Sequence, residues 1–194
     1  MRTRSYKCLS AHLKNHLKPG MHLALALSGG PDSMALFHLL CEAQSHFDFS
    51  LSLLHVDHGL REESRDEADI LSKLPFPFYT TRLELSGGNL EDQAREARYA
   101  FFEKIRSEIA FDALLLAHQR DDLAETALKR VCEGASLERQ YGMSSVSKRG
   151  EMVLWRPLLS CKKEELIDYL SDRQHFIDPT NFTNQFLRGR MRET

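Results

Sequence analysis

The chain has 194 residues, of which 42% are hydrophobic and 28% charged, and its net charge is −2. This composition is typical of one globular domain and excludes a collagen, a coiled-coil rod and a wholly disordered chain. Its longest apolar runs, Leu23–Leu27 and Ala113–Ala117, are far shorter than the about 20 residues that a membrane-spanning helix needs. We therefore expect no membrane association and, because no secretory signal pattern is present, a cytoplasmic location.

The first segment, residues 1–20, has five basic residues and no acidic one, whereas the rest of the chain has 21 basic and 28 acidic residues. Leu9, Leu13 and Leu17 recur at helical spacing, so we expect a basic helix that packs on the body through this apolar face. The positive charge of this helix would attract a polyanion, as would that of the arginine-rich end, residues 181–194. A solvated helix and a solvated tail are the plainer alternative.

Residues 21–180 alternate between short apolar runs and amphipathic stretches, which predicts repeated strand–helix units. Asn89 and Ser160 are expected to cap the helices that follow them. Expected strands cover 22–27, 50–56, 77–84, 112–117 and 151–155, and expected helices cover 34–45, 62–73, 90–109, 121–132 and 160–173.

The expected strands are apolar throughout, as in a sheet buried on both faces. Together with the intervening helices, they predict an α/β fold, a doubly wound, mostly parallel five-stranded sheet with helices on both faces. In such sheets ligands bind beyond the carboxyl ends of the strands, where the winding reverses. The loops 28–33, 57–61 and 118–122 are therefore the candidate functional segments.

The loop 28–33 reads Ser-Gly-Gly-Pro-Asp-Ser and leads from a strand into a helix. Its glycines let the backbone approach an anion closely, and the free N–H groups of the helix start favour phosphate. Hydroxyl groups from Ser28 and Ser33 add donors. The Walker and dinucleotide-binding glycine patterns are absent. Phosphate binding is the expected function of the whole loop, which consists of Ser28, Gly29, Gly30, Pro31, Asp32 and Ser33.

This hexapeptide resembles the pyrophosphate loop, S-G-G-x-D-S, of the N-type ATP pyrophosphatases, the PP-loop superfamily. That superfamily has an adenine nucleotide alpha-hydrolase-like fold and cleaves ATP between the α- and β-phosphates to adenylate a carbonyl oxygen. Further motifs, His55–Arg61, Ala117–Thr126, Arg156–Leu159 and Asp178–Asn181, resemble the tRNA(Ile)-lysidine synthase family in their order and intervals. The resemblance spans residues 20–192.

The chain departs from that family pattern at a few positions. Gln119 stands where the family has a second histidine, Leu123 where it has glutamine, and Gly189 where it has asparagine. Family members also continue beyond the last motif into a linker helix and a tRNA-binding appendage.

The resemblance implies a ligase that uses ATP and Mg²⁺, with the CAU-anticodon tRNA(Ile) and L-lysine as substrates; a homodimer is left open. The C2 carbonyl oxygen of the wobble cytidine would attack the α-phosphate of ATP, and lysine would then displace AMP to give lysidine. The implied catalytic residues are Asp32, His118, Asp121, Asp122, Arg188 and Arg190, with either Asp32 or Asp121 near Mg²⁺. ATP would also contact His55 and Asp57, and the implied substrate-binding residues are His58, Arg61, Arg95, Arg98, Glu125 and Arg192.

Several of these residues have plainer structural interpretations. His118 is equally suited to a structural hydrogen bond, and Asp121 and Asp122 would stabilise the first turn of a helix. Arg95 and Arg98 lie one turn apart on a helix, where they would pair with Glu91 or Asp92.

Two alternatives to the ligase remain open. One is a tRNA thiolase of the same superfamily, and the other is a nucleotide-binding module without catalysis. Thiolases use a cysteine pair or a C-x-x-C cluster site, whereas no C-x-x-C occurs here. The expected state of all four cysteines is therefore a free thiol, namely for Cys8, Cys41, Cys132 and Cys161.

Overall fold

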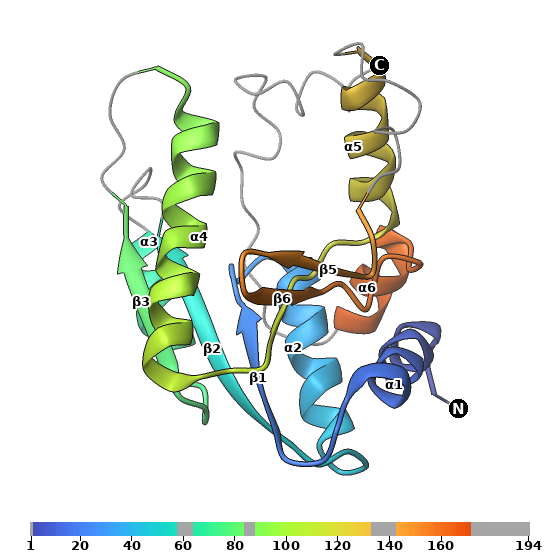
Figure 1. Ribbon diagram of the computed structural model, residues 1–194. Coiled ribbons are helices and arrows are strands. Elements are labelled where there is room, and N and C mark those ends of the chain that lie inside the picture. Colours follow the sequence, from blue (N-terminus) through green and yellow to red (C-terminus); the bar gives the residue numbers. More distant parts are fainter. Residues whose placement is uncertain (1, 58–63, 84–87, 133–142, 172–194) are drawn as a thin grey trace.

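A computed structural model describes residues 2–57, 64–83, 88–132 and 143–171, which form one mixed sheet with helices on both faces (Figure 1). The sheet has six strands in the order β3-β2-β1-β4-β6-β5. The strands are β1 (Met21–Ala26), β2 (Phe49–Asp57), β3 (Phe78–Arg82), β4 (Ala113–Leu115), β5 (Val146–Arg149) and β6 (Met152–Trp155). The helices are α1 (Arg4–His16), α2 (Pro31–Ala43), α3 (Ser64–Leu71), α4 (Leu90–Ile109), α5 (Arg120–Cys132) and α6 (Lys163–Leu170).

The α/β class and the parallel arrangement of the five predicted strands are confirmed, but the expected strand number is wrong. The sixth strand, β5, pairs antiparallel with β6 at one edge of the sheet. Its residues are partly or fully exposed, because an edge strand is not buried on both faces. It therefore lacks the apolar run by which the other strands are predicted.

The centre of the sheet fixes where a ligand can bind. Strand β1 pairs in parallel with β2 on one side and with β4 on the other. The chain adds β2 and β3 on the first side and returns to add β4 and β6 on the second, so the winding reverses between β1 and β4. The loops after these two strands, 28–33 and 116–119, meet at that point.

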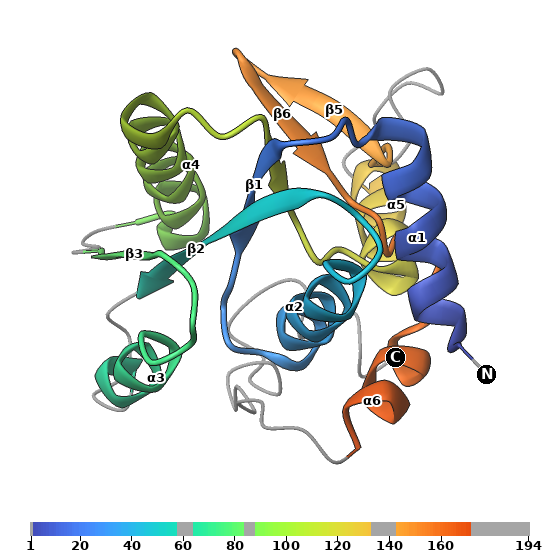
Figure 2. The ribbon, with the colours of Figure 1, turned by 90° about the horizontal axis from the view of Figure 1, so that it is seen from below.

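One face of the sheet is covered by α1, α2, α3 and α6, which lie on the same side in Figures 1 and 2. The core of this layer is formed largely by leucines that are fully buried, including Leu9 and Leu13 of α1, Leu36 and Leu39 of α2 and Leu166 of α6. The apolar face expected for the basic helix is therefore the surface through which α1 packs on the body.

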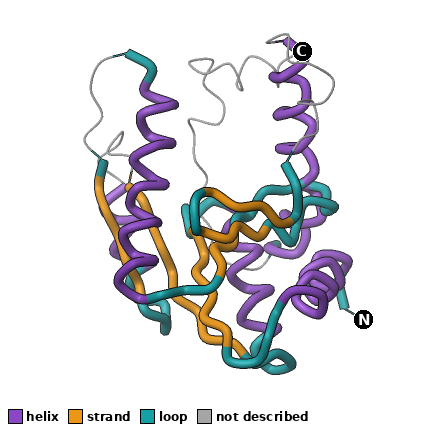
Figure 3. Tube along the Cα trace, viewed as in Figure 1, coloured by secondary structure: helices purple, strands orange, loops and turns teal. Residues whose placement is uncertain are grey.

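Helix α4 covers the other face, as the end-on view in Figure 2 and the tube in Figure 3 show. Tyr99, Phe102 and Ile105 are buried there against the sheet. Asn89 holds the N-cap position but does not cap through its side chain, because its backbone is left-handed with a φ of 57°. Its amide instead donates a hydrogen bond to Asp92 Oδ2 at 2.6 Å.

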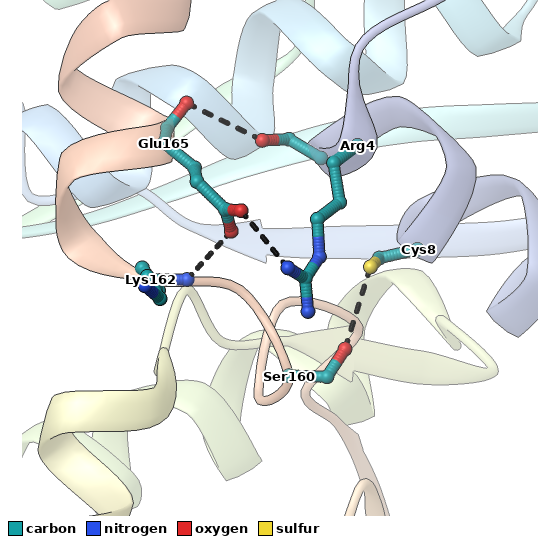
Figure 4. Close-up of polar contacts among 6 residues, drawn as sticks. Arg4, Cys8, Ser160, Lys162 and Glu165 are labelled. Atoms are coloured by element: carbon teal, nitrogen blue, oxygen red, sulfur yellow. Dashed lines mark hydrogen bonds and ion pairs between the residues drawn. The ribbon is translucent and has the colours of Figure 1, made fainter.

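The contact between α1 and the segment that leads into α6 is polar at its edge (Figure 4). Arg4 Nη1 lies 3.2 Å from Glu165 Oε1, and Cys8 Sγ lies 3.3 Å from Ser160 Oγ. The predicted cap at Ser160 is wrong, since α6 begins at Lys163 and the N–H of Lys162 donates to Glu165 Oε2. The hydroxyl of Ser160 faces α1 instead.

All four cysteines are free thiols, as expected. Within the described ranges, no helix is both long and apolar enough to cross a membrane.

Candidate functional site

The loop between β1 and α2 has the backbone that its glycines suggest. Gly29 has a φ of 85°, a left-handed conformation that favours glycine because it has no Cβ. Gly30 is the N-cap of α2, and Pro31 occupies the first helical position, where a missing N–H costs nothing. The helix thus starts at the carboxyl end of the central strand, and its positive dipole end lies at the reversal of the winding.

Two serine hydroxyls order this loop. Ser33 Oγ donates to the carbonyl oxygen of Gly30 at 3.0 Å and also lies 3.0 Å from Ser28 Oγ. The N–H of Gly30 points to Ser28 Oγ at 3.4 Å. These bonds fix the loop at the start of α2, and the start of a helix is where phosphate binds in other proteins.

A pocket of about 210 Å³ lies between this loop, the carboxyl ends of β1, β2 and β4, and α4. One end is polar and carries the side chains of Ser28, Asp32, Ser33 and His118, while Arg98 is at the α4 wall. The apolar wall between them consists of Ala26, Leu27, Leu54, Val56, Tyr99, Phe102, Leu116 and Ala117. The structure thus brings together the predicted phosphate loop, His118 and one of the two predicted α4 arginines.

His55 and Asp57 lie outside the lining of this pocket. Their neighbours Leu54 and Val56 line it, and successive side chains of a strand point to opposite faces. Nδ1 of His55 donates to the carbonyl oxygen of Leu27 at 2.8 Å, and its ring stacks on Phe78. His55 therefore fastens the end of β1 just before the phosphate loop.

Asp57 is also buried, and its Oδ2 lies 3.7 Å from Nε of Arg82. Neither residue lines the pocket, and a direct contact of either with ATP stays a prediction.

Helix α5 begins with a reciprocal cap that Gln119 provides. This side chain is 2% exposed, and its Oε1 accepts from the N–H of Asp121 at 2.7 Å. The N–H of Gln119 in turn donates to Asp122 Oδ2 at 3.0 Å. The residue that departs from the family pattern therefore has a structural function, and Asp122 stabilises the helix start as the plainer interpretation held. Glu125 lies about one turn further along α5, partly buried and outside the pocket lining.

Arginines gather around Tyr99 on the α4 side of the pocket. The guanidinium carbons of Arg95, Arg98 and Arg149 lie 5.8, 5.9 and 4.1 Å from the centre of its ring. Arg149 comes from β5, whereas the other two belong to α4. Arg95 is exposed and Arg98 half-buried. The predicted pair of α4 arginines is thus part of a larger group, and we call Arg95, Arg98 and Arg149 the Tyr99 arginine cluster.

Arg156 lies beside this cluster and was not among the predicted site residues. It is 7% exposed, and its Nη1 donates to the carbonyl oxygen of Ser144 and to Ser147 Oγ. Burial is the largest effect on its guanidinium and lowers the pKa. Tyr99 raises that pKa, and the positive charge of Arg95 lowers it. The sequence does contain a pattern that could have indicated Arg156 as a site residue. It directly follows the buried strand β6, at the same edge of the sheet as the other candidate loops.

The remaining predicted residues lie outside the described part of the chain: His58, Arg61, Arg188, Arg190 and Arg192. Within the described part, no three His, Cys, Asp or Glu side chains gather as a metal site. A carboxylate beside a phosphate loop, such as Asp32, nevertheless fits Mg²⁺, which binds through one or two carboxylates, phosphate oxygens and water.

Comparison with known proteins gives this site a family. Residues 1–194 match the model of the PP-loop domain. The chain is 38% identical over 190 residues to the tRNA(Ile)-lysidine synthase of Protochlamydia amoebophila, covering 94% of this chain and 42% of that protein. It is 40% identical over 178 residues to the synthase of Chlamydia pneumoniae, covering 87% of this chain and 54% of that one.

The chain thus spans about half the length of these curated relatives or less. Among solved structures, the U34-tRNA thiolase NcsA from Methanococcus maripaludis superposes with a TM-score of 0.79 at 17% identity, covering 97% of this chain and 70% of that one. At that identity the likeness shows a shared fold. With the phosphate loop at the reversal of the winding and the match along its whole length, the chain belongs to the PP-loop domain family.

Proposed function

We propose that this chain is the catalytic part of a tRNA(Ile)-lysidine synthase. The observation that carries the proposal is the pocket in which Ser28, Asp32, Ser33 and His118 meet at the reversal of the winding. The 37–40% identity to synthases of that name supports it. In the proposed reaction, ATP adenylates the C2 carbonyl oxygen of the wobble cytidine, and the amino group of L-lysine then displaces AMP.

ATP is proposed to place its β- and γ-phosphates on the loop 28–33. The first-turn N–H groups of α2 and the serine hydroxyls would hold the pyrophosphate as it leaves, because they are already ordered before ATP binds. Mg²⁺ bound at Asp32 or Asp121 would neutralise phosphate charge. The chain itself would act mainly by positioning reactants and stabilising charge, since phosphoryl-type transfers need little covalent chemistry from a protein.

The cytidine and lysine are proposed to enter from the α4 and α5 side. Arg98 lies at the pocket wall, where a guanidinium suits the displaced phosphate or the RNA backbone. A carboxylate, Asp32 or Asp121, would orient the ammonium group of lysine or accept its proton. Arg188, Arg190 and Arg192 are proposed to act on the reacting phosphate, as the family resemblance implies.

Two of the four cysteines, Cys41 and Cys161, are unsuited to sulfur transfer. Burial raises the pKa of Cys41 to about 11 and that of Cys161 to about 12. At neutral pH both are thiols, whereas a sulfur-transferring cysteine acts as the thiolate. Neither residue lines the pocket.

The test is incubation of the chain with ATP, Mg²⁺, CAU-anticodon tRNA(Ile) and radiolabelled lysine, followed by nucleoside analysis. We expect labelled lysidine, with one AMP and one pyrophosphate released per product. A second arm replaces lysine with sulfide, and a thionucleoside there would support the thiolase instead. ATP binding without tRNA-dependent ATP–pyrophosphate exchange, also in a C-terminally extended chain, would contradict the proposal and indicate a non-catalytic module.

A further inference from the structure

The Tyr99 arginine cluster joins two elements that are separate in the sequence. Arg149 at the end of β5 lies with its guanidinium carbon 4.1 Å from the centre of the Tyr99 ring. Tyr99 itself is 6% exposed and, with Arg98, lines the pocket. The β5–β6 hairpin therefore brings a cation onto the ring of a residue that lines the pocket, although Arg149 itself is not part of the lining.

Beneath the cluster, the buried Arg156 adds a fourth positive charge. Its Nε is buried without a hydrogen-bond partner among the described residues. A buried donor with no partner costs free energy comparable to a lost hydrogen bond, and a buried cation is costly unless it is paired. Four guanidinium groups thus lie around Tyr99, and this concentration of positive charge suits an anion.

Arg149 is held by a carboxylate that can be exchanged. Its Nη2 lies 2.5 Å from Oε2 of Glu96, whose side chain is 66% exposed. Exposed ion pairs contribute little to stability, whereas guanidinium–phosphate pairs form strong, often bidentate hydrogen bonds. A phosphate that approaches the pocket can thus replace Glu96 at small cost.

We propose that the Tyr99 arginine cluster binds phosphodiester groups of the RNA strand next to the base that enters the pocket, and that Glu96 occupies Arg149 until RNA displaces it. The inference rests on the proposed function for the identity of the ligand as RNA. Two members of the cluster, Arg95 and Arg149, lie outside the lining of the pocket that the loop 28–33 borders, so we assign the cluster to RNA rather than to ATP.

The test measures the affinity of the full chain for an RNA stem-loop with a CAU anticodon by fluorescence anisotropy, without ATP or lysine, between 50 and 200 mM salt. In Arg149→Gln we expect a several-fold loss at 50 mM salt and a salt slope that is smaller by about 0.7 per lost phosphate contact. In Glu96→Gln we expect the opposite, a several-fold gain, because Arg149 no longer has a competing carboxylate.

Lys148→Gln is the matched control. Lys148 is an exposed neighbour on the same strand, and its side chain points to the other side of that strand. Lys148→Gln removes the same charge as Arg149→Gln. Because this side chain points away from the cluster, we expect an RNA affinity close to that of the unmodified chain. Circular dichroism of each variant verifies that it is folded.

Three results would overturn the inference. In the first, the unmodified chain fails to bind the stem-loop at 50 mM salt, or Arg149→Gln behaves like Lys148→Gln. In the second, Glu96→Gln weakens RNA binding as Arg149→Gln does, which would make the ion pair a structural brace. In the third, Arg149→Gln leaves RNA binding unchanged but weakens ATP binding in a separate titration with ATP alone. Because the assay contains neither ATP nor lysine, a chain that binds RNA as expected but forms no lysidine would refute the proposed function alone.

Discussion

The two faces of the sheet differ in how completely helices cover them. On one face, α1, α2 and α6 bury a continuous leucine-rich core that reaches to the end of the strands. On the other, α4 packs through Tyr99, Phe102 and Ile105, and the pocket lies between this helix and the strand ends. The comparison teaches that the leucine-rich layer of α1, α2 and α6 is scaffold, and we call it the closed layer. The layer of α4 leaves room for a ligand, and we call it the ligand layer.

The same contrast appears between neighbouring residues of one strand. In β2, Leu54 and Val56 face the pocket, whereas His55 and Asp57 are buried toward the closed layer. The alternation of the strand thus separates the polar residues of the motif from its apolar ones. Here the apolar side chains are the ones that face the pocket.

The largest effect on stability is expected in the closed layer. Leu39 of α2 is fully buried, so Leu39→Ala should lower the free energy of unfolding by about 2–5 kcal/mol through lost burial and the cavity that remains. Leu128→Ala, at a leucine of α5 that is 51% exposed, should change it by less than about 0.5 kcal/mol. Urea denaturation measures both, and equal losses would contradict the full burial of Leu39 in this layer.

Much of the closed layer could be predicted from the sequence, because buried parallel strands and amphipathic helices leave periodic apolar patterns. The leucines of residues 1–20 predicted the packing of α1. Strand β5 could not be predicted in this way, since its residues Val146–Arg149 are partly exposed at the sheet edge.

A smaller effect is expected at the phosphate loop, where the ligand layer begins. Gly29→Ala forces an alanine into a left-handed backbone and should cost about 1–2 kcal/mol of stability. At Gly30 an added Cβ would meet Ser28 Oγ at 3.5 Å with an ordinary φ of −68°, so Gly30→Ala is the matched control with a smaller loss. Thermal unfolding compares the two, and a larger loss at Gly30 would contradict the described loop geometry.

The candidate site was predictable where a motif lies in one loop and less so where distant segments meet. Ser28, Asp32, Ser33 and His118 follow the central strands directly, so topology alone places them together. The position of Arg149 over Tyr99 depends on β5, and the structural use of Gln119 depends on the first turn of α5. Such contacts between segments leave no local pattern.

A pH-dependent effect of similar size is expected from a histidine in the closed layer. Burial, with a smaller contribution from His16, lowers the pKa of His12 from 6.5 to about 4. The unfolded chain therefore binds a proton that the folded chain rejects, and the stabilisation present above about pH 6.5 is lost as the pH falls toward 4. Between pH 7 and 5 we expect a loss of about 2 kcal/mol, or about 4–8 °C in Tm.

The variant His12→Phe keeps a ring against Trp155 and should remove that part of the pH dependence, whereas His16→Gln at an exposed position should not. Calorimetric scans at pH 7 and pH 5 measure the difference. An identical pH dependence of Tm in His12→Phe and the unmodified chain would show that the ring is not shielded from water.

The central claim, that the loop 28–33 binds the phosphates of ATP, is tested most directly by calorimetric titration of ATP into the double variant Ser28→Ala/Ser33→Ala. Hydrogen bonds to charged groups contribute about 1.5–3 kcal/mol each, so the loss of two such bonds predicts an ATP affinity lower by about a hundredfold or more. Ser45→Ala, just beyond the opposite end of α2, should leave the affinity unchanged. An unchanged ATP affinity in the folded double variant would contradict the account.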